Sequence, residues 1–134
     1  MRKIIVSAII ATTALSSCEK ECPYYMEGKK CENEVRTNYL GTYDGVLTVG
    51  NASDNATSVV SVISTEPKHI KIGNLNAELS SKIGFNIPLQ DWVLNGTTFQ
   101  AEGNGSFENT QLKFSIILTY QGEKGAAAFI GNKQ

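Results

Sequence analysis

Residues 111–121, with the sequence QLKFSIILTYQ, carry the clearest structural pattern in this chain of 134 residues. Apolar or aromatic side chains occupy every even position from 112 to 120, and every odd position except Ile117 is polar. Successive side chains of a β-strand point to opposite faces, so this period of two predicts a strand. Its even-numbered side chains, up to and including Tyr120, are expected to be buried.

Residues 39–134 as a whole have the composition of an all-β domain. They are rich in Val, Ile, Thr and aromatic residues, with turn-forming residues about every ten positions. A long turn is expected at 50–55, a tight hairpin turn at Asn95-Gly96, and a bulge or edge position at Pro88. No segment has a sustained helical period, so little helix is expected. The expected strands cover residues 39–49, 57–65, 69–75, 77–82, 85–93, 97–107, 111–121 and 126–130.

About eight short strands joined by hairpins form an all-β antiparallel meander, which closes either as a barrel or as a two-sheet β-sandwich. The sequence Gly41-Thr42-Tyr43 at the start of the first strand resembles the G-x-W opening of lipocalins and fatty-acid-binding proteins, with Tyr in place of Trp. That resemblance implies a small lipocalin-like or calycin-like β-barrel over residues 39–134. The sandwich stays open as the alternative.

The first seventeen residues have the features of a secretory signal peptide. A basic start, Met1-Arg2-Lys3, precedes an apolar run over residues 4–14 that is too short to span a bilayer. Small residues then separate Leu15 from Cys18, which resembles the bacterial lipobox. The resemblance implies cleavage after residue 17 and acylation of Cys18, by palmitate among other chains, so that a membrane is a partner through this anchor.

A second resemblance covers the segment that follows Cys18. Gly28, Cys31, Glu34-Val35-Arg36 and the start of the first strand at 39–43 resemble the leader of lipoproteins from Bacteroidota. The resemblance implies an outer-membrane lipoprotein of the cell envelope with a lipocalin-like domain. The residues themselves leave open whether the membrane is the inner or the outer one, and which face, the periplasmic one or the cell surface, carries the protein.

Residues 18–38 are polar and charged, with few apolar side chains that could join a core, and are expected to form a tether. With Cys18 acylated, Cys22 and Cys31 remain as an even pair in an oxidising compartment, so they are expected to form a disulfide. Their spacing fits a zinc or redox site poorly.

The charge balance excludes one class of partner. Removal of residues 1–17 takes away Arg2 and Lys3 and leaves 10 basic and 13 acidic residues, a net charge of −3. Nucleic-acid binding needs a basic face, so no nucleic-acid partner is expected.

Catalytic residue types are scarce, so the protein is expected not to be an enzyme and to need no cofactor or metal. His69 is the single histidine and is expected at an exposed strand edge. One histidine cannot build a histidine metal site, and nothing in the spacing of Asp44, Asp91 and Glu102 selects a pair of catalytic carboxylates.

Binding is the more plausible activity, because an eight-stranded barrel is either filled by side chains or holds one small ligand. We therefore expect an envelope lipoprotein whose barrel binds a small apolar ligand or an envelope protein. The alternative is a structural or accessory lipoprotein with a filled core.

Trp92 is expected to be exposed, because it lies on the opposite phase from Phe85 and Ile87. The candidate ligand-binding residues are Tyr43, Leu47, Phe99, Phe114, Ile116 and Tyr120. Further side chains expected to face inward are Tyr39, Phe85, Ile87, Leu118 and Phe129.

Overall fold

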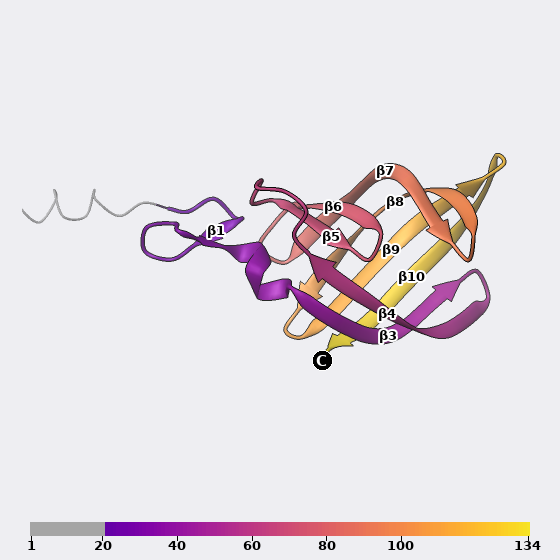
Figure 1. Cartoon of the computed structure of the whole chain (residues 1–134), viewed down its shortest axis with the longest axis horizontal. Coiled ribbons are helices and arrows are strands. Elements are labelled where there is room, and N and C mark those ends of the chain that lie inside the picture. The colour runs from indigo at the N-terminus through magenta and orange to yellow at the C-terminus, as the bar shows by residue number, and fades with distance from the viewer. Residues whose placement is uncertain (1–20) are drawn as a thin grey trace, which may run out of the picture.

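The computed structural model describes residues 21–134; the predicted signal peptide (1–17) and Cys18 lie outside the described residues. Eight strands form a closed antiparallel barrel in the order β10-β3-β4-β5-β6-β7-β8-β9 (Figure 1). All neighbours in the barrel wall are also neighbours in sequence except β10 and β3, whose pairing closes it. This confirms the predicted meander barrel against the sandwich. The strands of the wall are β3 (Gly41–Val49), β4 (Ala52–Ser61), β5 (His69–Ile72), β6 (Leu75–Leu79), β7 (Gly84–Leu94), β8 (Thr97–Glu108), β9 (Gln111–Tyr120) and β10 (Glu123–Lys133).

Strands β4 and β10 begin earlier than the sequence predicted, and β4 ends at Ser61, before the predicted end at residue 65. Residues 52–55 were expected in a turn because Ser, Asp and Asn are weak strand formers, yet they pair with β3 from Val46 to Val49. Pairing with a neighbouring strand outweighs intrinsic preference here. The turn therefore shrinks to residues 50 and 51.

Two hairpins that close the wall use pairs of residues with positive φ. Asn95 and Gly96 have φ of 51° and 81°, and Gln121 and Gly122 have φ of 52° and 82°. Two consecutive residues of this kind form a turn whose twist matches that of the flanking strands. The turn predicted at Asn95-Gly96 is confirmed, and the last turn lies at residues 121–122.

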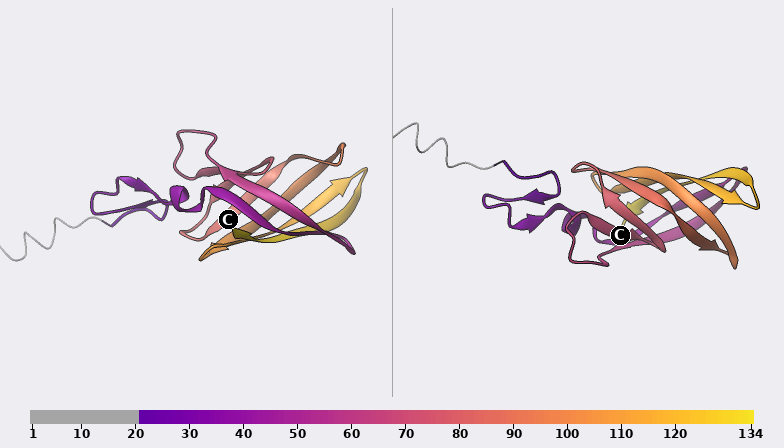
Figure 2. Two further views of the ribbon diagram at one scale, coloured as in Figure 1. Left: turned by 60° about the horizontal axis from the view of Figure 1, so that its bottom comes forward. Right: turned by 90° about the horizontal axis from the view of Figure 1, so that it is seen from above.

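The two ends of the barrel differ, and they are named here by what they carry. The far end carries the turns at residues 50–51, 95–96 and 121–122. The tether end carries the loops at 62–68 and 80–83, the segment before β3, and the C-terminus (Figure 2).

Large side chains fill the half of the barrel at the tether end. Tyr43, Phe85 and Phe107 are each about 1% exposed. The Phe107 ring lies 5.1 Å from the Phe85 ring and stacks on Tyr39 at 4.0 Å. Such aromatic pairs contribute roughly 0.5–1.5 kcal/mol beyond the area that they bury. This half is a packed core. The other side chains that were predicted to face inward and are buried are Ile87, Phe114, Ile116, Leu118 and Phe129.

Glycines allow neighbouring strands to approach closely at several places in the wall, of which Gly45 and Gly103 are the tightest. A Cβ atom on Gly45 would overlap the carbonyl oxygen of Ile130, and one on Gly103 would overlap that of Ser115. Strand glycines of this kind permit the curvature that closes a small barrel.

The tether forms a small hairpin of β1 (Met26–Glu27) and β2 (Asn33–Glu34), followed by the 3-10 helix η1 (Val35–Tyr39). The predicted disulfide is confirmed: the sulfur atoms of Cys22 and Cys31 lie 2.12 Å apart and their Cα atoms 5.5 Å apart. Within residues 21–134 no helix is long and apolar enough to span a membrane.

The expectation that the tether contributes little to the core was wrong. Val35 and Arg36 are 2% and 3% exposed, and Tyr24 and Tyr25 pack against the barrel core. The Tyr24 hydroxyl also donates to the Leu79 carbonyl oxygen at 3.0 Å. These contacts bind the described part of the tether to the tether end of the barrel.

Candidate ligand cavity

A cavity of about 500 Å³ lies toward the far end of the barrel and opens through its wall. Strands β5 and β6 supply its floor through Ile72 and Leu75. Ligand pockets in proteins typically measure roughly 300–1,000 Å³ and are mostly apolar, so both the size and the lining suit a small molecule. The inward side chains that line it from the other strands are Leu47, Ala56, Trp92, Leu94, Phe114 and Phe129.

The rim of this cavity is more polar than its interior. Residues 57–59 of β4, the β5–β6 turn at residues 73–74, and Val93 of β7 surround the opening. None of the residues that line the cavity, all within the described range 21–134, carries a charge. An isolated ion is costly to bury without a partner, so this lining favours an apolar or neutral occupant.

Trp92 lines the cavity and is 8% exposed, which contradicts the prediction that it is exposed. The reason is a bulge in β7. Ile87 pairs with Gly103 and Gln90 with Ala101, so β7 advances by three residues while β8 advances by two. The extra residue reverses the phase of the strand, turning Trp92 inward and leaving Leu89 63% exposed. The bulge predicted at Pro88 is therefore present.

The structure separates the six candidate ligand-binding residues into three groups. Leu47 and Phe114 line the cavity. Tyr43 and Ile116 are 1% and 2% exposed and belong to the packed core.

Phe99 and Tyr120 lie together at the far end, with ring centroids 5.5 Å apart, beside a second hollow of about 320 Å³. Tyr120 is 46% exposed, so the prediction that it is buried with the rest of its strand face was wrong. It is the last residue of β9, where the wall ends and period two no longer ensures burial.

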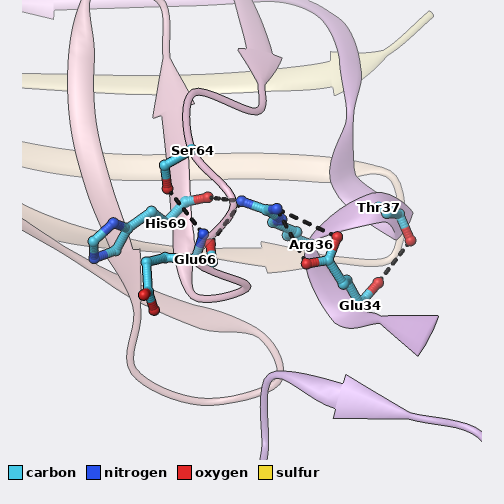
Figure 3. Close-up of polar contacts among 6 residues, drawn as sticks. All are labelled: Glu34, Arg36, Thr37, Ser64, Glu66 and His69. Carbon is cyan, nitrogen blue, oxygen red and sulfur yellow. Dashed lines mark hydrogen bonds and ion pairs between the residues drawn. The ribbon is translucent and has the colours of Figure 1, made fainter. Parts of the chain in front are cut away.

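Arg36 forms the most buried polar cluster among residues 21–134 (Figure 3). Its Nη1 donates to the carbonyl oxygens of Glu66 and His69, both at 2.7 Å. Its Nη2 lies 3.1 Å from a carboxylate oxygen of Glu34. The Ser64 hydroxyl accepts the Glu66 backbone N–H at 3.2 Å. The cluster fixes the loop at 62–68 to the tether.

Two tyrosines connect this end of the barrel to the tether. The Tyr43 hydroxyl donates to the Tyr39 carbonyl oxygen at 2.9 Å, and the Tyr39 hydroxyl donates to the Lys82 carbonyl oxygen. Burial raises the pKa of both hydroxyls above 10.0, and the charge of Glu27 raises that of Tyr39 further. Both groups are therefore protonated donors at neutral pH.

The residues weighed for catalysis lie apart. The His69 side chain is 42% exposed, with its Nε2 atom 3.9 Å from a Glu78 carboxylate oxygen. Asp44 accepts from the Thr57 hydroxyl at 2.8 Å on β3, whereas Asp91 on β7 accepts from the Gln100 amide. No group of three or more His, Cys, Asp or Glu side chains comes together in the described part of the chain.

Sequence reasoning missed Ser58, Asn74 and Arg36. The expected strand at 69–75 ran through Gly73, so the sequence did not indicate the short β5 strand and the turn that lie beside the opening. No pattern in the sequence marks Arg36 as buried, because its burial depends on carbonyl oxygens thirty and more positions away.

Comparisons with protein-family models, with curated proteins and with solved structures returned no match. Fold and cavity together define the class: a small antiparallel β-barrel with an uncharged cavity that opens through its wall.

Proposed function

We propose that this protein is a non-enzymatic lipoprotein of the bacterial cell envelope whose barrel binds a small apolar ligand. Acylated Cys18 anchors it to the outer membrane, and the disulfide-bonded tether holds the barrel beside that anchor. The proposal for the anchor rests on the sequence at residues 1–18. The proposal for binding rests on the cavity.

One observation carries the binding function: the cavity of about 500 Å³ lined by inward apolar side chains. Apolar surface removed from water contributes about 25 cal/mol per Å². A ligand that covers Trp92, Phe114 and Phe129 would gain this free energy without displacing any charged group. The closed wall holds these side chains in place before the ligand arrives, which lowers the entropic cost of binding.

Native mass spectrometry of residues 19–134, secreted by its own host, tests the binding function. We expect a co-purifying small molecule that dissociates on denaturation. Ala56→Phe fills the cavity from β4 and should abolish its retention. Ala126→Phe places the same side chain on the exposed face of β10 and should retain the ligand. A bare mass for both the wild type and Ala126→Phe would contradict the proposal.

A structural or accessory lipoprotein is the second candidate, and the packed half of the barrel favours it. Tyr43, Phe85 and Phe107 are each about 1% exposed and pack against one another at the tether end, as expected of a purely structural barrel. A bare mass together with failure of an apolar fluorescent probe to bind would make this the better interpretation.

The anchor has its own test. Cys18→Ser should prevent incorporation of radiolabelled palmitate and move the protein from the membrane fraction to the soluble fraction. Cys22→Ser with Cys31→Ser should still be labelled, since these cysteines form the disulfide. Labelling of the Cys18→Ser variant would contradict the lipoprotein assignment.

A further inference from the structure

The barrel wall has one built-in gap, and it lies between β4 and β7. There the wall consists only of the short β5–β6 hairpin. β4 pairs with β5 only at Val60 and Ser61, and β6 pairs with β7 only at Glu78 and Leu79. By contrast, β3 and β4 pair along nine residues. The cavity opens on the far-end side of the β5–β6 turn, between residues 57–59 of β4 and residues 92–94 of β7.

Hydrogen bonds close the border of this gap that faces the tether end, so the opening is a defined feature of the wall. The Gly73 backbone N–H donates to the Val59 carbonyl oxygen at 2.8 Å. The Gln90 side chain accepts the Asn76 backbone N–H at 2.8 Å and donates to the Asn76 carbonyl oxygen at 2.7 Å. This amide takes the place of a strand partner where the bulge turns β7 away from β6.

The residues that line the rim offer neutral hydrogen-bonding groups and carry no charge themselves. Ser58 is 8% exposed and points inward from β4, and its hydroxyl lies near the β5–β6 turn, 3.7 Å from where a Cβ of Gly73 would stand. Asn74 is exposed beside it, and Thr57 is exposed on the outer face of β4, where its hydroxyl donates to the Asp44 carboxylate at 2.8 Å. Deeper in the cavity, Trp92, Phe114 and Phe129 offer apolar and aromatic surface. The indole N–H of Trp92 is the one polar side-chain group among these three.

We propose that the gap between β4 and β7 admits a neutral single-chain amphiphile, with its apolar chain inside the barrel and its uncharged head group hydrogen-bonded to Ser58 at the rim. This assignment rests on the proposed binding function and adds the route, the orientation and the head-group chemistry. A hydroxyl, ester or amide head group fits the rim. A carboxylate or ammonium head group would lie against the rim without an opposite charge from any of the lining residues.

Trp92 is the single tryptophan of the chain and reports directly on the cavity. Titrations of the mature chain, followed by Trp92 fluorescence, should use decanol, decanoate and decyltrimethylammonium, which share one chain length and differ in head-group charge. We expect decanol to bind at least about tenfold more tightly than either ion. Equal or tighter binding of either ion would overturn the head-group assignment while leaving apolar binding intact. No change with any of the three probes would overturn the binding function itself.

Two pairs of variants test the head group and the route. Ser58→Ala should weaken decanol binding by about threefold to tenfold, and Ser115→Ala on the outer face of β9 should leave it unchanged. Asn74→Phe places a ring at the gap and should slow decanol association by about fivefold or more. Lys124→Phe places one at the far end, beside the second hollow, and should not. The reverse result for the last pair would show that ligands pass through the far end.

Discussion

Arg36 is the residue on which the attachment of the tether depends most. Arg36→Met keeps most of the side-chain volume but leaves the carbonyl oxygens of Glu66 and His69 without their donor. We expect the free energy of unfolding to fall by about 3 kcal/mol, because buried groups lose charge-assisted hydrogen bonds. Urea denaturation followed by Trp92 fluorescence measures this.

The partner of Arg36 provides the matched control. The Glu34 side chain is 31% exposed, so Glu34→Gln should cost less than about 1 kcal/mol. An Arg36→Met variant as stable as the wild type would show that the two carbonyl oxygens find water instead and that the guanidinium is dispensable.

Tyr39 and Tyr43 make the fold sensitive to alkaline pH. Burial raises the pKa of both hydroxyls in the folded state, so the unfolded chain loses these protons first. Their contribution to stability is complete below pH of about 10 and is lost as the pH rises through the folded-state pKa values. A Tyr39→Phe, Tyr43→Phe chain should be less stable at neutral pH and lose less stability between pH of about 9 and about 11. Equal loss in both chains, measured by urea denaturation across this range, would contradict the assignment.

At the scale of strands, the close approach of β3 and β10 depends on Gly45. Gly45→Ala would place a methyl group against the Ile130 carbonyl oxygen, so closure requires the strands to separate. We expect a loss of more than about 3 kcal/mol in the free energy of unfolding. Gly125→Ala on β10 meets nothing within 4 Å and should be neutral or slightly stabilising. Thermal denaturation of the two variants compares them directly, and equal midpoints would refute the packing argument.

Strand periodicity predicted the elements well and failed where a local irregularity changed the phase. The alternation over residues 111–119 gave the buried face of β9 correctly, since nothing interrupts the pairing there. The same reasoning misplaced Trp92, because one extra residue at the bulge reverses every side chain after it. Pro88 indicates that a bulge is near, but it does not show at which residue the phase of the strand changes.

At the scale of the whole molecule, the tether is part of the folded unit. A chain that starts at residue 39, the boundary predicted from the sequence, lacks buried Val35 and Arg36. Burial of a Val side chain alone contributes roughly 1.5–3 kcal/mol. We expect this chain to unfold at a clearly lower urea concentration than the chain from residue 21. Replacing only Cys22 and Cys31 by Ser should cost less, since η1 and its contacts stay. Equal midpoints for the two chain lengths would make the tether a passive linker.

The candidate site was predictable in part. Leu47 and Phe114 follow from strand phase and a barrel fold, and both line the cavity. The opening does not follow from phase, because it depends on the mismatch in length between the β5–β6 hairpin and its neighbours β4 and β7. That mismatch becomes visible only when pairing is known, since four residues of a short strand leave no periodic signal of their own.

The pairing of β3 with β10 has a consequence for the order in which the chain is made. Tyr43 pairs with Lys133, and the Gln134 backbone N–H donates to the Thr42 carbonyl oxygen at 2.9 Å. The earliest strand of the barrel, β3, therefore stays without one of its two neighbours until β10 has been synthesised. Contacts so distant in sequence form slowly, and unpaired strand edges invite association between chains. During biogenesis this barrel needs protection from association with other chains for as long as β10 is missing, and any chaperone that supplies it must release the chain only when β10 can pair.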